Sequence, residues 1–253
     1  MSHQEQLAFF QAVADVNGDL IAGGRVLEIG SYDVNGTVRS IFEAREYVGV
    51  DLVHGPGVDI VSFGHEIAEP SGSYDLAISG ECFEHDPHWQ ATFLNMARLT
   101  RPGGVVAFTC ASTGRPEHGT RRSRVGDSPG TQSEGIDYYR NLSEADFRSL
   151  PLADLFDEHR FWYMPTSFDL YFAGVRAGAR DGNIPSDDRV VAIRRVMSLG
   201  HRALRLPLRV AKRLVPETRY QAVILPYWLG LLRIKDAVER TRSNGDVSVP
   251  PKV

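Results

Sequence analysis

Apolar positions recur with two different periods along the chain. Leu7, Phe10 and Val13 are spaced as on one face of an amphipathic helix, which Gly18 brings to an end. Beyond it, short apolar runs rich in β-branched residues alternate with helical stretches. Parallel strands joined by right-handed crossover helices produce this alternation. We therefore expect an α/β fold.

Apolar runs predict the individual strands, and helical patterns lie between some of them. We expect helices near Thr37–Ala44 and from about His88 to Thr100. Another helix begins at Ser143, with Asp146 in place of the usual Glu of a capping box. Two further runs, FDEHRFWYM and FDLYFAGVRA, follow this helix. The earlier strands are predicted at Arg25–Gly30, Tyr47–Leu52, Gly57–Val61, Tyr74–Ser79 and Gly104–Ala111.

Two segments depart from this rhythm. Residues 112–141 form a long polar stretch, too long for a neutral connection, so we expect an active-site lid. The alternative is an exposed, solubilising loop. After Arg180, arginines punctuate an apolar helical pattern that ends in AVILPYWLGLLRI. We therefore expect a domain at 1–180, a basic amphipathic helical appendage at 181–242, and a disordered polar tail at 243–253.

The appendage has three interpretations. It packs as a helical cap on the core, forms the interface of a homodimer, or rests on a membrane surface. Arginines beside a stripe that contains Tyr227 and Trp228 suit anionic headgroups. We expect that the segment buries its apolar surface against protein, either its own core or a second copy, and that the chain stays soluble without lipid.

Composition narrows the partners and the compartment. The 253 residues are 42% hydrophobic and 24% charged, which is typical of a soluble globular protein. The net charge of −4 offers no general attraction for nucleic acid, so no nucleic-acid partner is expected. Cys82 and Cys110 lie in apolar segments, and the N-terminus lacks the basic region of a signal peptide. We expect a cytoplasmic protein.

The run VLEIGSYDVNG reads as a strand, a turn and the start of a helix. Gly30 allows a tight turn and lets a ligand approach the backbone, while Gly36 relieves crowding at the helix start. Asp51 ends the next strand about twenty residues later, where a carboxylate can accept both hydroxyls of a ribose. The turn lacks the G-x-G-x-x-G of dinucleotide enzymes. Glu28 can instead bind a cationic amino group, such as that of S-adenosylmethionine.

Four successive motifs carry a family resemblance: VLEIGSYDVNG, YVGVDL, YDLAISGECFEH and LTRPGGVVAFT. They resemble those of class I S-adenosylmethionine-dependent methyltransferases, of the type 11/23-like kind, and the last two runs look like that family's closing hairpin. The resemblance implies a Rossmann-like, seven-stranded, mostly parallel sheet with helices on both faces and an antiparallel last strand. It also implies S-adenosylmethionine as the cofactor. The implied cofactor-binding residues are Glu28, Gly30, Ser31, Gly36, Asp51, Leu52, Gly80 and Glu81.

The end of the fourth strand carries the spacing Glu81-x-x-Glu84-His85. It is similar to the E-x-x-E-H signature of metal-dependent ubiquinone O-methyltransferases and small-RNA 2′-O-methyltransferases. A divalent ion lowers the pKa of a weakly nucleophilic hydroxyl and holds it in line. Oxygen ligands favour Mg²⁺, and a histidine widens the choice to Mn²⁺ and other ions. The resemblance implies the ligands Glu81, Glu84, His85 and His118, the last from beyond the fifth strand.

A reading without metal competes with this one. The Glu–His pair then caps the next helix or touches the cofactor, and His85, titrating near neutrality, acts as the general base beside Glu84. A surface role unrelated to catalysis is the third interpretation. Whether or not a metal ion binds, we expect the catalytic residues to be His85 and Glu84.

The lid supplies hydroxyls, amides, arginines and tyrosines that can bind a polyhydroxylated acceptor. We expect His118, Tyr138 and Tyr139 to contact this substrate. The leading hypothesis is an O-methyltransferase that acts on a saccharide or glycosylated metabolite. One alternative is a methyltransferase for phenolic, quinone-type or other small molecules at a membrane surface. Another is a protein that binds S-adenosylmethionine without transferring its methyl group.

Overall fold

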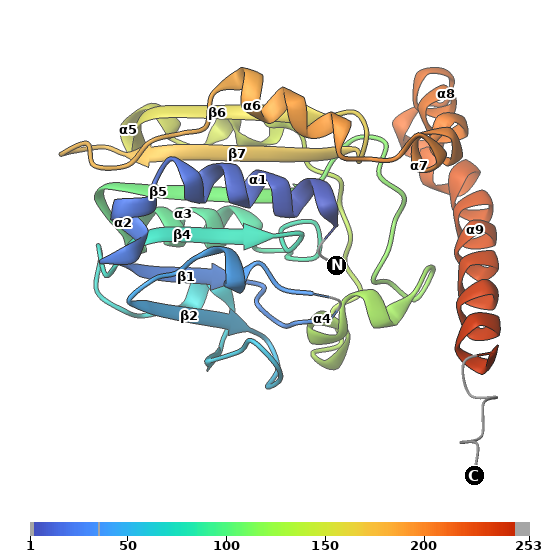
Figure 1. The fold of residues 1–253 in the computed structure, drawn as a ribbon, viewed down its shortest axis with the longest axis horizontal. Helices are drawn as coiled ribbons and strands as arrows, with labels where there is room; N and C mark the ends of the chain where they lie inside the picture. Colours follow the sequence, from blue (N-terminus) through green and yellow to red (C-terminus); the bar gives the residue numbers. More distant parts are fainter. Residues whose placement is uncertain (1–2, 35, 246–253) are drawn as a thin grey trace, which may run out of the picture. The chain divides into compact units, whose positions relative to one another are not determined.

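One seven-stranded sheet forms the centre of the protein in this computed structural model, which describes residues 3–34 and 36–245. The strand order is β3-β2-β1-β4-β5-β7-β6, and Figure 1 shows most of this order from one edge to the other. Every pair is parallel except those of β7, which runs antiparallel to both β5 and β6. The predicted fold is therefore confirmed. The strands are β1 (Arg25–Ile29), β2 (Glu46–Asp51), β3 (Ile60–Val61), β4 (Tyr74–Gly80), β5 (Thr100–Ala111), β6 (Phe156–Met164) and β7 (Asp169–Arg176).

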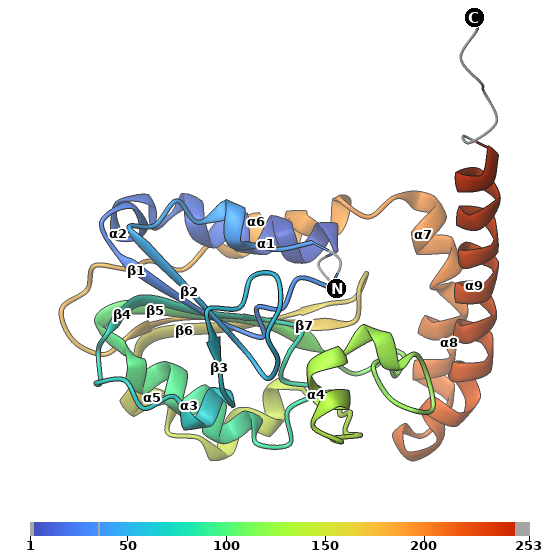
Figure 2. The same cartoon turned by 90° about the horizontal axis from the view of Figure 1, so that it is seen from below.

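Helices cover both faces of the sheet, as Figure 2 shows. One face carries α1 (Gln4–Asp15), α2 (Gly18–Ala22) and α6 (Asp187–Ala192), and the other carries α3 (Trp89–Leu99) and α5 (Leu152–Leu155). Successive residues of a strand point to opposite faces. Val26 accordingly joins the core cluster that contains Phe10 of α1, whereas Leu27 joins the cluster that contains Phe93 of α3. The next residue, Glu28, is thus directed to the α1 face.

Two predicted elements are shorter than expected. The helix predicted at Thr37–Ala44 is only a 3₁₀ turn, η1 (Arg39–Ile41), which ends where Phe42 adopts an extended backbone conformation. The strand predicted at Gly57–Val61 pairs with β2 only at Ile60 and Val61. Asp59 accepts a hydrogen bond from the Gly49 amide at 2.7 Å, and this contact joins the segment to β2 before the strand begins.

The capping box is present, although the element that it begins is a 3₁₀ helix. Ser143 and Asp146 form both capping contacts at the start of η4 (Glu144–Ser149). Other short elements are η2 (Gly64–Glu66) and, within the predicted lid, η3 (Val125–Asp127) and α4 (Pro129–Ser133). The lid segment thus contains local structure.

Contacts divide the chain into two units, Met1–Arg205 and Leu206–Val253. Residues 181–205, assigned to the appendage from the sequence, therefore group with the sheet. The physical reason is burial: Val190 and Ile193 belong to the core cluster on the α1 face, and the Trp162 indole donates to Asp187 at 2.8 Å. This unit also contains η5 (Ile193–Arg195) and α7 (Leu199–Leu204).

The second unit consists of α8 (Leu206–Leu214) and α9 (Glu217–Gly245). The Tyr220 hydroxyl of α9 donates to the Leu208 carbonyl of α8 at 3.3 Å. The start of the tail predicted to be disordered, 243–245, is helical, and the rest of it lies outside the described residues. Over residues 3–34 and 36–245, no helix combines the length and apolar character needed to cross a membrane.

Candidate active site

A pocket lies beyond the carboxyl ends of β1, β2 and β4, the position at which parallel α/β sheets bind ligands. Gly30, Asp51, Leu52, Gly80 and Glu81 line it from the sheet side. The lid contributes Asp127, Ser128, Pro129, Gly130, Thr131 and Ile136. Five of the eight residues predicted to bind the cofactor thus line one pocket, and the lid covers part of it.

The turn after β1 requires a glycine at position 30. Gly30 has φ +81°, and a Cβ at this position would lie 2.8 Å from Cys82 Cβ. Its amide donates to the Val50 carbonyl at 2.9 Å, which holds the turn against β2. A side chain here would strain the backbone and separate the ends of β1 and β4. The glycine therefore allows the close approach of backbones that forms the pocket.

Asp51 ends β2 with a well-positioned carboxylate. It accepts hydrogen bonds from the backbone amides of Tyr32, at 3.1 Å, and Leu52, at 2.7 Å. Burial raises the pKa of Asp51, and these two amide donors act in the opposite direction. The carboxylate lies in the pocket wall, where it can accept hydrogen bonds from a ligand's hydroxyl groups.

A second cavity shares Gly30, Tyr32, Val34 and Gly80 with the first and extends toward α1. The other three predicted cofactor residues, Glu28, Ser31 and Gly36, line this cavity. Glu28 accepts a hydrogen bond from the Tyr47 hydroxyl at 2.7 Å, and burial raises its pKa to about 7. Gln6 of α1 also lines the cavity. The sequence reading missed Gln6 because nothing in a helical pattern signals a side chain directed into a pocket.

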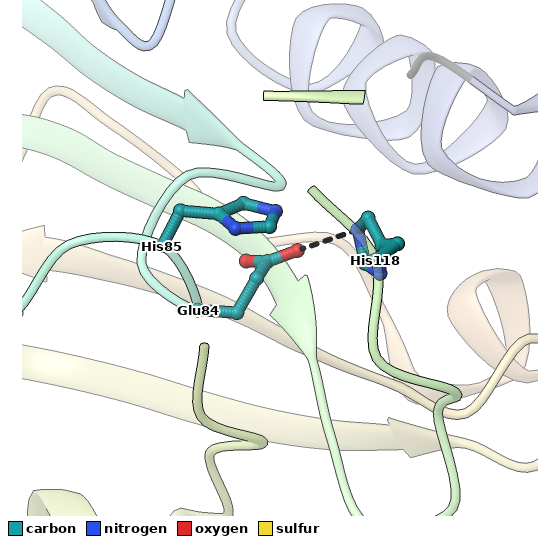
Figure 3. Close-up of side chains that lie close together, drawn as sticks. All are labelled: Glu84, His85 and His118. Carbon is teal, nitrogen blue, oxygen red and sulfur yellow. Dashed lines mark ion pairs between the residues drawn. The ribbon is translucent and has the colours of Figure 1, made fainter. Parts of the chain in front are cut away.

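Glu84 and His85, which are buried, and the half-buried His118 form a cluster beside the first pocket (Figure 3). His85 also lines that pocket. One ligand atom from each lies within 4.8 Å of the others, and Glu84 Oε1 is 3.8 Å from His118 Nε2. Glu84 and His85 lie in the turn after β4, where the His85 amide donates to the Cys82 carbonyl. His118 arrives from the segment after β5. The ring centroids of His85 and His118 are 4.9 Å apart.

The electrostatics of this cluster suit a bound cation. Burial raises the pKa of Glu84 to about 7, lowers that of His85 to about 3, and lowers that of His118 well below its usual value. Within the part of the chain that the structure describes, neither Glu84 oxygen nor His85 Nδ1 has a hydrogen-bond partner. Neutral imidazoles and a carboxylate are ready metal ligands. The expectation that His85 titrates near neutrality is not met, because burial disfavours its charged form.

Glu81 belongs to a different group from the one expected. Its backbone has φ +54°, and its carboxylate lies 3.4 Å from Arg115 Nη2. Arg115 Nη1 in turn lies 2.9 Å from Asp169 Oδ1, and Asp169 Oδ2 lies 2.9 Å from His3 Nε2. Of the four expected metal ligands, Glu84, His85 and His118 therefore lie together, whereas Glu81 lies apart from them. Glu81 is drawn away because its carboxylate pairs with the guanidinium of Arg115.

The predicted substrate residues lie around the cluster. The Tyr139 ring centroid is 5.4 Å from that of His85 and 5.1 Å from that of His118, and its hydroxyl donates to the Pro116 carbonyl. Tyr138, half-buried, contributes its backbone as a hydrogen-bond partner of His85. Cys82 and Cys110 are free thiols, and burial raises the pKa of both well above the usual value. Neither is suited to act as a nucleophile.

Comparisons with known proteins agree with this architecture. The model of the methyltransferase domain family matches residues 1–175. No curated protein matches the chain.

Among solved structures, the chain is similar to 1,6-didemethyltoxoflavin-N1-methyltransferase of Burkholderia thailandensis, at 18% identity and a TM-score of 0.47, over 68% of this chain and 79% of that one. It is also similar to a phosphoethanolamine N-methyltransferase 2 of Haemonchus contortus, at 17% and 0.48, over 66% of this chain and 52% of that one. An S-adenosylmethionine-dependent methyltransferase of Mesorhizobium loti matches at 15% and 0.47, over 69% and 99%.

Proposed function

Because this chain belongs to the methyltransferase domain family and is a class I S-adenosylmethionine-dependent methyltransferase, we propose that it methylates a hydroxyl group with the help of a divalent metal ion. The acceptor that we propose is a saccharide or a glycosylated metabolite. The observation that carries the proposal is the position of the Glu84, His85 and His118 cluster, which borders the pocket through His85.

Two adjoining cavities support the use of S-adenosylmethionine. Asp51 can accept hydrogen bonds from the ribose hydroxyls, and Glu28 can neutralise the amino group of the methionine end. Gly30 lines both cavities, so we expect the ligand to pass along its backbone. The methyl group is then expected near Gly80 and Glu81, residues that line the pocket beside the cluster.

The cluster suits a metal ion by its donor types, and among the described residues the Glu84 oxygens and His85 Nδ1 have no hydrogen-bond partner. One carboxylate and two neutral imidazoles form a mixed oxygen and nitrogen set that suits Mn²⁺ and accepts Mg²⁺ less readily. A bound ion would supply Lewis acidity, which lowers the pKa of a coordinated hydroxyl. The residues themselves would hold the ion, and Tyr139 would limit the access of water on the lid side. His85, with a pKa of about 3, is a weak base in this setting, which favours the metal reading over general-base catalysis by His85.

The composition of the lid supports an acceptor with several hydroxyl groups. Hydroxyl and amide side chains are frequent in residues 112–141, and such groups act as both donors and acceptors, as do the hydroxyls of a sugar. Ser128 and Thr131 line the part of the pocket that we assign to the cofactor ribose. We therefore expect the acceptor nearer the metal-ligand cluster, where Tyr139 lies against His85 and His118 and can contact a sugar ring.

The test is methyl transfer from methyl-labelled S-adenosylmethionine to separate pools of sugars, glycosylated metabolites and phenols. We expect label in a sugar-containing pool, recovered as an alkali-stable methyl ether. The Glu84→Gln variant should lose at least tenfold in rate, whereas Glu144→Gln, at an exposed position of η4, should not. Label found only on nitrogen or only in phenols would contradict the proposed acceptor.

A further inference from the structure

The first turn of α1 lies beside the cofactor cavities. Figure 2 shows α1 on one face of the sheet, the face to which Glu28 is directed by the alternation along β1. Gln6 and Glu28 line the same cavity, together with Gly80 at the end of β4. A helix far from the glycine-rich turn in sequence thus contributes a polar side chain to the same site.

Gln6 is buried without the pairing that a structural glutamine normally has. The residue is 2% exposed, and its Oε1 finds no hydrogen-bond partner among the described residues. Its Nε2 lies so close to Gly80 that a Cβ there would be 2.3 Å away. Gln11, in the same helix, is exposed and donates to Asp15 at 2.7 Å. Because a buried polar atom usually has a partner, the unpaired oxygen of Gln6 points to a ligand.

His3 holds this turn of the helix in place. Its Nδ1 accepts a hydrogen bond from the backbone N–H of Gln6 at 3.2 Å and so caps α1. Its Nε2 lies 2.9 Å from Oδ2 of Asp169 in β7. The backbone that carries Gln6 is therefore tied to the sheet by a specific contact. A side chain on an anchored turn loses little conformational entropy when it binds a ligand.

We propose that Gln6 binds the amino-acid end of S-adenosylmethionine, with its side-chain oxygen accepting a hydrogen bond from the ammonium group that Glu28 neutralises. This inference rests on the proposed use of that cofactor. The ammonium group has several N–H donors, so one acceptor from α1 and one from β1 can bind it together. Ligands that lack the amino-acid end have no group for Gln6 to bind.

Calorimetry with two ligands tests the assignment. S-adenosylhomocysteine carries the amino-acid end, whereas 5′-methylthioadenosine shares its adenosine and thioether and lacks that end. For Gln6→Ala, we expect the Kd of S-adenosylhomocysteine to rise by about tenfold or more, as for loss of a hydrogen bond to a charged group, with that of 5′-methylthioadenosine unchanged. Gln6→Met, which keeps the side-chain length, should behave in the same way. Gln11→Ala is the matched control and should bind both ligands as the parent does.

The outcomes separate this inference from the function on which it rests. An equal loss for both ligands in Gln6→Ala and Gln6→Met would assign Gln6 a structural role and overturn the inference. Unchanged binding of S-adenosylhomocysteine by both variants would overturn it as well. A folded parent protein that binds neither ligand would instead refute the proposed cofactor site, and the role of Gln6 with it.

Discussion

Gly130 of the lid lies against the carboxylate of Asp51 at the end of β2. A Cβ built at Gly130 would stand 2.6 Å from Asp51 Oδ1, which is closer than Cβ atoms come to other atoms in folded proteins. The two residues come from segments far apart in the sequence, and both line the pocket. The lid therefore meets the sheet at the acid that we assign to the ribose, and the pocket depends on both.

This contact predicts that Gly130→Ala weakens the binding of both S-adenosylhomocysteine and 5′-methylthioadenosine, since both ligands contain the ribose. The added methyl crowds Asp51 Oδ1, and we expect a loss of about tenfold, within the range of overpacking costs. Calorimetry measures both affinities. Gly126→Ala in the same lid is the control, because a Cβ there meets nothing within 4 Å among the described residues. Parent-like affinity in Gly130→Ala would contradict the contact.

Asp51→Ala should weaken the binding of both ligands more than Gly130→Ala does. We expect a loss of about 1.5–3 kcal/mol in binding free energy, the range for hydrogen bonds to charged groups. The variant also leaves the amides of Tyr32 and Leu52 without their carboxylate acceptor. Asp51→Asn keeps one acceptor oxygen and should lose less. Thermal unfolding of each variant separates lost binding from lost stability. Undiminished binding by a folded Asp51→Ala protein would show that the ribose lies elsewhere.

Cofactor affinity should depend on pH through Glu28. Burial raises its pKa to about 7 in the free protein, and pairing with an ammonium group requires the ionised form. Above pH 7 the carboxyl group is already ionised, so affinity is constant until the ligand's own amino group loses its proton at higher pH. Below pH 7 a proton must leave on binding, so affinity for S-adenosylhomocysteine falls by up to about tenfold per pH unit.

The Glu28→Gln variant assigns this dependence. It should bind S-adenosylhomocysteine weakly at every pH and lose the decline below pH 7. The affinity for 5′-methylthioadenosine, which has no ammonium group, should not show the fall below pH 7 that is due to Glu28. A decline that persists unchanged in Glu28→Gln would have to come from another acid.

Chelation should abolish methyl transfer, and Mn²⁺ or Mg²⁺ should restore it. Glu84→Gln and His118→Ala each remove one ligand from the cluster and should raise the metal concentration needed for half-maximal activity by about tenfold or more. His201→Ala, at an exposed histidine of α7, should leave it unchanged. Full turnover after exhaustive chelation would overturn the proposed metal dependence.

Two truncations should behave differently. Ending the chain after Arg180 removes Val190 and Ile193, which are 0% and 5% exposed, from the core on the α1 face. We expect this protein to aggregate, because losing buried large apolar side chains costs about 2–5 kcal/mol each. Ending it after Arg205 keeps the first unit whole and should preserve cooperative unfolding. Light scattering and thermal unfolding measure both, and aggregation of the longer form would contradict the division at Arg205.

The sequence by itself determined the sheet and the end of it at which the pocket lies. Strand segments follow from short β-branched runs, and the turn at Gly30 follows from a backbone conformation that glycine adopts readily. The position of Asp51 follows from where β2 ends. These features depend on neighbouring residues and on the alternation of side chains, so they can be read from a local pattern. The closing antiparallel hairpin followed from the family resemblance.

Only the tertiary structure decided which side chains meet across the site. It directs Gln6 into the cavity with Glu28, pairs Glu81 with Arg115, and places Gly130 on Asp51. It also sets the charge of the cluster, because burial, which the sequence does not state, lowers the pKa of His85 to about 3. Each of these relations joins residues that are distant along the chain or depends on the exclusion of water. No local pattern encodes such distances or such burial, so both had to come from the packed fold.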